Sequence, residues 1–118
     1  MDVQIFGTQK HADVRKALRF FKERRVQVHF VDLKERAASK GELQRFAQKF
    51  GVTALIDKNS KRYAELGLGV VRYDDNRWLE TLVLEPLVLC VPLVRFQHKV
   101  TIGFAEDEWK SWVEAGKQ

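Results

Sequence analysis

The segment that decides the fold runs from Val3 to Val31 and reads VQIFGTQKHADVRKALRFFKERRVQVHFV. Its opening, Val3–Phe6, alternates loosely between apolar and polar residues and ends at a glycine, which predicts a first strand. From about His11 to Arg25, apolar residues recur at three- and four-residue spacing, which predicts an amphipathic helix with a basic outer face. Val26–Val31 alternates again and predicts a second strand. Because a helix joins the two strands, we expect them to lie parallel.

The middle of the chain predicts a group of helices. Ser39 and Glu42 match a capping box, in which each residue satisfies the other's backbone amide, and Gly51 suits the end of the helix that follows. The expected helices are one from Ser39 to about Phe50, two short ones between residues 52 and 66 that break at Asn59-Ser60, and one over 76–85 that Pro86 stops.

The last third predicts two strands and a closing helix. Residues 92–96 and 99–104 are strand-like and are separated by Gln97-His98, a candidate two-residue hairpin turn. A helix is expected over 106–115, with Trp109 and Trp112 on one face. A hairpin added to a parallel β-α-β unit gives an α/β protein with a mixed sheet flanked by helices.

Composition limits the size and class of the molecule. The chain has 118 residues, 45% hydrophobic and 31% charged, which fits one globular domain over residues 1–118. Its one cysteine cannot form an internal disulfide, and its start lacks the pattern of a secretory signal. The longest apolar run, Leu87–Val94, is too short to span a membrane. We therefore expect a cytoplasmic protein without a membrane partner.

The chain is basic, with a formal net charge of +5 and a pI near 9.5. This balance favours anionic ligands, nucleic acid or acidic proteins as partners, although interspersed charges also serve only to keep a domain soluble. Direct nucleic-acid binding is the weakest hypothesis, because the basic residues are not interleaved with aromatic stacking platforms. His11, His29 and His98 lack metal-ligand spacing, so no metal is expected.

Several motifs resemble the ArsC/Spx family, which is related to bacterial arsenate reductases. The opening Ile5–Ala17 resembles the family's strand, aromatic-glycine pair, short loop and basic helix that ends in Lys-Ala. Further resemblances follow in the family's order along the chain: Val31–Lys34, Ser39–Phe50, Tyr63–Leu68, Glu85–Leu87, Val91–Arg95 and Lys99–Phe104.

The resemblance implies a thioredoxin-like, or glutaredoxin-like, fold. Its core would comprise residues 1–33 and 87–118, and residues 34–86 would form a helical insert between the β-α-β half and the β-β-α half. The family's activity depends on a cysteine at the start of the first helix, where backbone amides and the helix dipole lower the pKa of the thiol. In this chain that position holds His11, and the position of a resolving cysteine holds Val14.

Three hypotheses for His11 remain open: a solvated first-turn residue of a lost site, a retained ligand-binding residue, or a general acid or base. The arginines with which arsenate reductases of this family hold the oxyanion are also missing. Cys90 and Val91 precede Pro92, Phe104 follows Gly103, and Leu55–Lys58 contains no arginine. Loss of both the nucleophile and the anion clamp argues against arsenate reduction.

The frame of the site is retained at Pro92, which the resemblance implies is a cis proline facing the loop before the first helix. Backbone at such a proline pairs with an extended peptide such as glutathione, or the proline serves the fold alone. The ligand-binding candidates are Thr8, Lys10, His11, Val91 and Pro92. No cofactor is expected apart from glutathione.

Cys90, the single thiol, lies two residues before Pro92, so we expect it near His11. A Cys–His pair suggests a nucleophile, but the apolar run around Cys90 favours a small core residue instead.

Two functions compete. The first is a binding or regulatory protein on an inactivated redox scaffold, for example one associated with an RNA polymerase subunit, since Spx-like members bind the polymerase α-subunit. The second is a thiol- or glutathione-linked oxidoreductase related to arsenate reductase.

Overall fold

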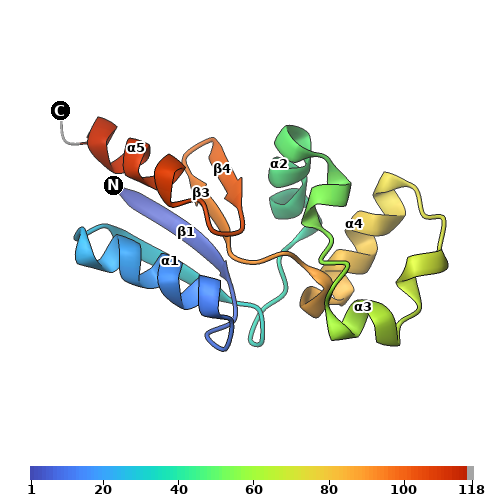
Figure 1. Ribbon diagram of the computed structural model, residues 1–118. Coiled ribbons are helices and arrows are strands. Elements are labelled where there is room, and N and C mark those ends of the chain that lie inside the picture. The colour runs from blue at the N-terminus through green and yellow to red at the C-terminus, as the bar shows by residue number, and fades with distance from the viewer. Residues whose placement is uncertain (117–118) are drawn as a thin grey trace. The chain divides into compact units, whose positions relative to one another are not determined.

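The computed structural model describes residues 1–116 and divides into two compact units (Figure 1). The sheet unit contains Met1–Arg36 together with the chain from Val91 onward, and the helical unit contains Ala37–Cys90. Each unit has a core of its own, so each is described separately.

The sheet unit is built on four strands. The strands are β1 (Asp2–Gly7), β2 (Gln27–Asp32), β3 (Leu93–Phe96) and β4 (Lys99–Ile102), and the helices are α1 (Ala12–Glu23) and α5 (Glu106–Gly116). The strand order is β2-β1-β3-β4, with β1 parallel to β2 and the other pairs antiparallel. The expected mixed sheet is therefore confirmed, as is the hairpin turn at Gln97-His98, where Gln97 takes a positive φ of 55°.

Alternation along the strands explains why α1 and α5 cover the same face of the sheet. Val3, Ile5 and Val94 point to that face and form one buried cluster with side chains of both helices. The helical members of the cluster are Ala17, Phe20 and Phe21 of α1 and Trp109, Trp112 and Val113 of α5. The one buried polar side chain among the described core residues, Thr101, accepts a hydrogen bond from Trp109 Nε1 at 2.8 Å. The aromatic face predicted for the last helix is confirmed.

The helical unit begins with a capped helix. Its elements are α2 (Lys40–Phe50), η1 (Val52–Leu55), α3 (Lys61–Glu65), η2 (Leu68–Val70), α4 (Asp75–Leu84) and η3 (Pro86–Val88). The capping box is confirmed, because Ser39 Oγ accepts from Glu42 N at 3.1 Å and Glu42 Oε1 accepts from Ser39 N at 2.9 Å. Gly51 ends α2 with a φ of 85°, which suits glycine.

Two local predictions in this unit needed adjustment. The break at Asn59-Ser60 is confirmed, since Ser60 caps α3, but η1 is a 3₁₀ turn rather than an α-helix. Pro86 does end α4, yet it also begins η3, because a proline at the first helical position forfeits no hydrogen bond. The core of the unit includes Leu43 and Leu82, both fully buried.

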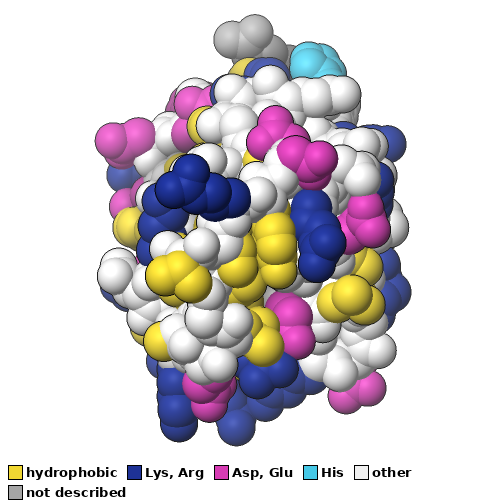
Figure 2. All heavy atoms as spheres, turned by 90° about the vertical axis from the view of Figure 1, so that its right-hand side faces the viewer, with side chains coloured by type: hydrophobic (Ala, Val, Ile, Leu, Met, Phe, Trp, Pro, Cys, Tyr) yellow, Lys and Arg dark blue, Asp and Glu magenta, His cyan; other side chains and the backbone are white. Residues whose placement is uncertain are grey.

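Charged groups separate the exposed apolar side chains of the helical unit. Val70, Leu84 and Leu87 are its most exposed large hydrophobic residues. Figure 2 views the side that carries α3 and α4 and shows hydrophobic side chains among both cationic and acidic ones. This face therefore lacks a single dominant charge. Among the described residues, no helix combines the length and apolar composition needed to cross a bilayer.

Candidate functional site

His11 is the N-cap of α1, one position before the first helical residue. Its backbone is extended, with a φ of −81° and a ψ of 128°, and its Nδ1 accepts a hydrogen bond from Asp13 N at 3.2 Å. Its carbonyl accepts the first helical bond, from Arg15 N at 3.1 Å. The spacing of apolar residues predicted a helix that begins at about His11, which would put His11 in the first turn. Histidine is not among the residues that usually cap helices.

The loop before His11 is fixed by a residue that the sequence did not single out. Arg15 Nη1 donates to Gln9 O at 2.9 Å and to Lys10 O at 2.7 Å. Thr8 O accepts from His11 N at 3.1 Å, so the loop turns directly into the cap. Of the two loop candidates, Thr8 is half-buried and Lys10 is exposed. Arg15 lies five and six residues after Lys10 and Gln9, which was the one indication of these contacts in the sequence. Residue spacing does not show where a long side chain points.

The position of a resolving cysteine is filled by packing. Val14 is fully buried, and a Cβ built on Gly7 would lie 2.5 Å from Val14 Cγ2. Gly7 therefore lets α1 approach the end of β1, in addition to ending the strand. The resemblance placed a resolving cysteine at this position, and the valine methyls here pack against Gly7 of β1 instead.

Pro92 lies at the end of the sheet where this loop begins. The Val91–Pro92 bond is cis, as the resemblance implied. Phe6 pairs with Leu93, so continuing that antiparallel register places Pro92 opposite Gly7. Pro92 O accepts from Gly103 N at 2.8 Å. Within the described residues the backbone groups of Val91 have no hydrogen bond, which leaves a donor and an acceptor next to the proline.

Cys90 belongs to the helical unit. Its amide donates to Leu55 O at 2.8 Å, and its side chain is partly buried. Burial raises the pKa of the Cys90 thiol, and the nearby charge of Asp57 raises that pKa further. Less thiolate is therefore present at neutral pH than for an ordinary cysteine. The expected proximity of Cys90 to His11 stays a prediction.

Phe104, where the resemblance placed one of the missing arginines, contributes an aromatic surface. Its side chain is 47% exposed, and its ring meets Trp109 edge-on with centroids 5.4 Å apart. Lys16 Nζ lies 5.6 Å from the ring centre of Phe104. The segment Leu55–Lys58, where the resemblance placed another arginine, carries Asp57 and the exposed Lys58 in the helical unit. Neither position supplies a guanidinium for bidentate anion binding.

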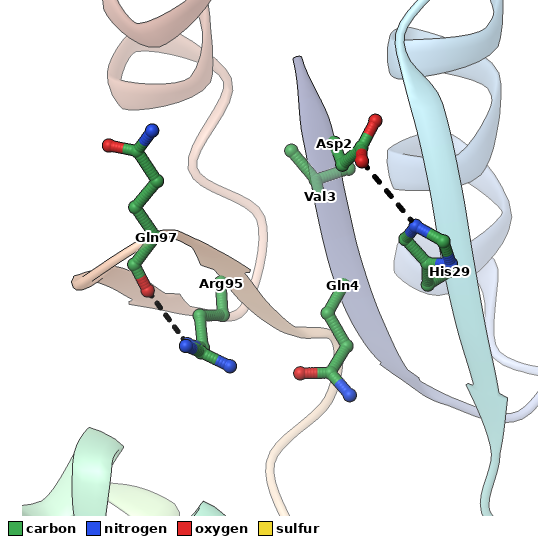
Figure 3. Close-up of a pocket in the computed structure, with 6 residues that line it drawn as sticks. All are labelled: Asp2, Val3, Gln4, His29, Arg95 and Gln97. Atoms are coloured by element: carbon green, nitrogen blue, oxygen red, sulfur yellow. Dashed lines mark hydrogen bonds and ion pairs between the residues drawn. The ribbon is translucent and has the colours of Figure 1, made fainter.

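A polar hollow lies on the sheet face opposite α1 and α5. It has a volume of about 290 Å³, and Figure 3 shows the residues that line it: Asp2, Val3, Gln4, His29, Arg95 and Gln97. The chargeable groups in it already have partners. His29 Nε2 lies 3.8 Å from Asp2 Oδ2, and Arg95 Nε donates to Gln97 O at 2.7 Å. The described residues contain no cluster of three or more metal-ligating side chains, here or elsewhere.

Known proteins match both the sequence and the fold. Residues 6–112 match the model of the ArsC family. Over 114 residues the chain is 26% identical to the uncharacterized protein YusI of Bacillus subtilis strain 168, covering 93% of this chain and 97% of YusI. Arsenate reductase from Vibrio cholerae superposes with a TM-score of 0.82 at 22% identity, over 94% of this chain and 97% of that one. The protein YFFB superposes with a TM-score of 0.84 at 17% identity, over 92% and 96%.

The structural likenesses confirm the thioredoxin-like fold expected from the motifs. The family match spans both halves of the sheet unit and the helical unit between them. Within that match, a histidine that caps α1 stands where the resemblance placed the nucleophilic cysteine. The chain is a member of the ArsC family.

Proposed function

We propose that this chain is a binding protein on an ArsC scaffold and does not catalyse thiol redox chemistry. The observation that carries the proposal is the role of His11, whose ring nitrogen caps α1 at the place where the family chemistry needs a thiolate. An imidazole there accepts the amide hydrogen bond but cannot form a mixed disulfide. Val14 stands where the resemblance placed a resolving cysteine, and the positions expected for the anion-binding arginines hold other residues.

The retained features favour an extended peptide as the ligand of this site. Val91 offers a free amide and carbonyl beside the cis proline, and extended chains bind such backbone by adding a strand. Thr8 and Lys10 lie in the loop that follows β1, the strand next to β3 in the sheet. A polymerase subunit is the specific partner that the family resemblance suggests, and glutathione is the smallest ligand of the right kind.

Disulfide exchange with glutathione tests the absence of redox catalysis. We expect the native protein incubated with glutathione disulfide to keep its mass, because the one thiol, Cys90, has a raised pKa. A glutathione adduct at Cys90 in the folded protein would contradict the proposal and favour a thiol-linked oxidoreductase. Denatured protein is the control, since its exposed thiol should react.

Restoring a thiol at position 11 tests whether the frame is intact. In a Cys90→Ala background, we expect His11→Cys to give a thiol with a lowered pKa, because the α1 amides stabilise a thiolate. The matched control is His98→Cys, which places the single thiol on the exposed hairpin turn. Alkylation rates measured against pH should separate the two variants. Equal pKa values would show that the cap no longer supports the family chemistry.

The partner hypothesis is tested separately with the tagged native chain. We expect a pull-down from bacterial lysate to recover a stoichiometric protein, with polymerase subunits examined first. Recovery of no stoichiometric partner would count against a binding function while leaving the redox result unaffected.

A further inference from the structure

The outer edge of β2 carries backbone groups that no strand pairs. β2, which carries His29 in Figure 3, is the last strand on its side of the sheet. Gln27 N donates to Met1 O at 3.3 Å and Leu33 N donates to Gly7 O at 3.0 Å. The backbone N–H and C=O groups of the odd-numbered residues of β2 therefore point toward β1. Val28 and Phe30 must then direct their N–H and C=O groups outward. Among the described residues, the outward N–H and C=O groups of Val28 and Phe30 have no hydrogen-bond partner.

An apolar hollow runs beside this edge. It has a volume of about 340 Å³ and is lined by Leu18, Lys22, Val26, Val28 and Phe30. Val28 and Phe30 pair with Val3 and Ile5 of β1, so their side chains lie on the face covered by α1. Both are only partly buried, because no further strand completes the packing. Alternate side chains of an added strand would therefore enter the hollow.

The charge beside the hollow is strongly positive. Residues 15–25 contain six cationic side chains and one acidic one, an excess equal to the net charge of +5 of the whole chain. Leu18 and Lys22 lie four residues apart on one side of α1, while Arg15 of the same row donates to the loop carbonyls of Gln9 and Lys10. Lys22 lines the hollow itself. An occupant of the hollow therefore meets the cation of Lys22 directly, on a helix that is basic as a whole.

We propose that the β2 edge binds an extended, acidic segment of another protein by strand addition. Exposed strand edges are natural templates for such pairing, and main-chain bonds supply affinity while alternate side chains supply specificity. Val28 and Phe30 offer two donors and two acceptors. Alternate side chains of the segment enter the hollow, apolar ones against Leu18, Val28 and Phe30 and a carboxylate toward Lys22. A second copy of this chain is disfavoured, because edge-to-edge pairing would bring two copies of Lys22 and of the basic helix α1 together. The proposal goes beyond the site at His11 and does not depend on it.

Binding is tested with two matched peptides. The probe is a fluorescent heptapeptide with threonine at every second position and valine or aspartate at the others, so that valine and aspartate share the face that meets the hollow. Its control replaces each aspartate with lysine. We expect the acidic peptide to bind with an affinity that falls as salt is added, and the lysine peptide to bind at least on the order of tenfold more weakly. Amide resonances of Val28 and Phe30 should shift, and their hydrogen exchange should slow.

Two variants localise the effect. Lys22→Glu should weaken binding by on the order of tenfold, because it places a like charge beside the peptide carboxylates. Arg19→Glu changes the charge of α1 by the same amount outside the hollow and should weaken binding much less. Val28→Pro removes an outward donor and should abolish binding. If Val28→Pro does not fold, Lys22→Glu carries the conclusion.

Several results would overturn the proposal. They are absence of binding by the acidic peptide, equal weakening by Lys22→Glu and Arg19→Glu, or resonance shifts centred away from β2. A concentration-dependent dimer that Lys22→Glu strengthens would show that a second copy covers this edge instead.

Discussion

Gly7 is the residue whose small size most directly positions the site. Any Cβ there would meet Val14 Cγ2 at 2.5 Å, and Val14 is fully buried. We expect Gly7→Ala to lower the free energy of unfolding by about 1–3 kcal/mol, the usual cost of overpacking a core. Urea unfolding followed by circular dichroism measures the loss.

The same contact supplies a control for that prediction. If the clash with Val14 is the cause, the double variant Gly7→Ala, Val14→Ala should be less destabilised than the two single variants combined, since each change relieves the other. Strict additivity would show that the backbone at Gly7, rather than its approach to Val14, determines the cost.

At the scale of elements, one ion pair ties α3 to the residue that ends α4. Arg62 Nε donates to Glu85 Oε2 at 2.9 Å and Arg62 Nη2 donates to Glu85 Oε1 at 3.0 Å, a bidentate arrangement. The hydrogen bonds from Arg62 lower the pKa of Glu85. A carboxyl with a lowered pKa stabilises the fold above its ordinary pKa and loses that contribution as the pH falls through its folded value.

This linkage predicts how the effect of an Arg62 variant depends on pH. Arg62→Met should destabilise the protein at neutral pH, and the difference from wild type should shrink in acid below the ordinary pKa of glutamate. Arg72→Met, at an exposed arginine of the same unit, should show no such dependence. Urea unfolding at the two pH values tests this, and a difference that persists in acid would exclude Glu85 as the source.

Elements with local determinants could be predicted from the sequence. Ser39 and Glu42 act within one helical turn, so the capping box was identified correctly. Apolar residues alternate along β1 and β2 because one face of the sheet is buried, so the two strands were identified correctly as well. The capping role of His11 was missed because histidine seldom caps helices. The Arg15 contacts and the approach of Gly7 to Val14 were missed because they depend on side-chain direction and distance, which residue spacing does not specify.

For the whole molecule, the important feature is that one unit interrupts the other in sequence. β1 and β3 are neighbours in the sheet, yet the chain between α1–β2 and β3 passes through Ala37–Cys90. When that segment is folded, the two parts of the sheet unit are joined by a structured connection. When it unfolds, the same pairing must close a long flexible loop, whose entropy opposes it. The stability of the sheet should therefore depend on the fold of the helical unit.

Tryptophan fluorescence can test this dependence, because the units carry separate probes. Trp109 and Trp112 are buried in the sheet unit, and Trp78 is the tryptophan of the helical unit. In a Trp78→Phe background, the remaining signal reports on the sheet unit alone. Leu43→Ala, which removes a fully buried side chain from the helical unit at a cost of about 2–5 kcal/mol, should lower the urea midpoint of that signal. Leu84→Ala, at a side chain 78% exposed, is the control and should shift it little. An unchanged midpoint in Leu43→Ala would show that the sheet closes without help from the chain that interrupts it.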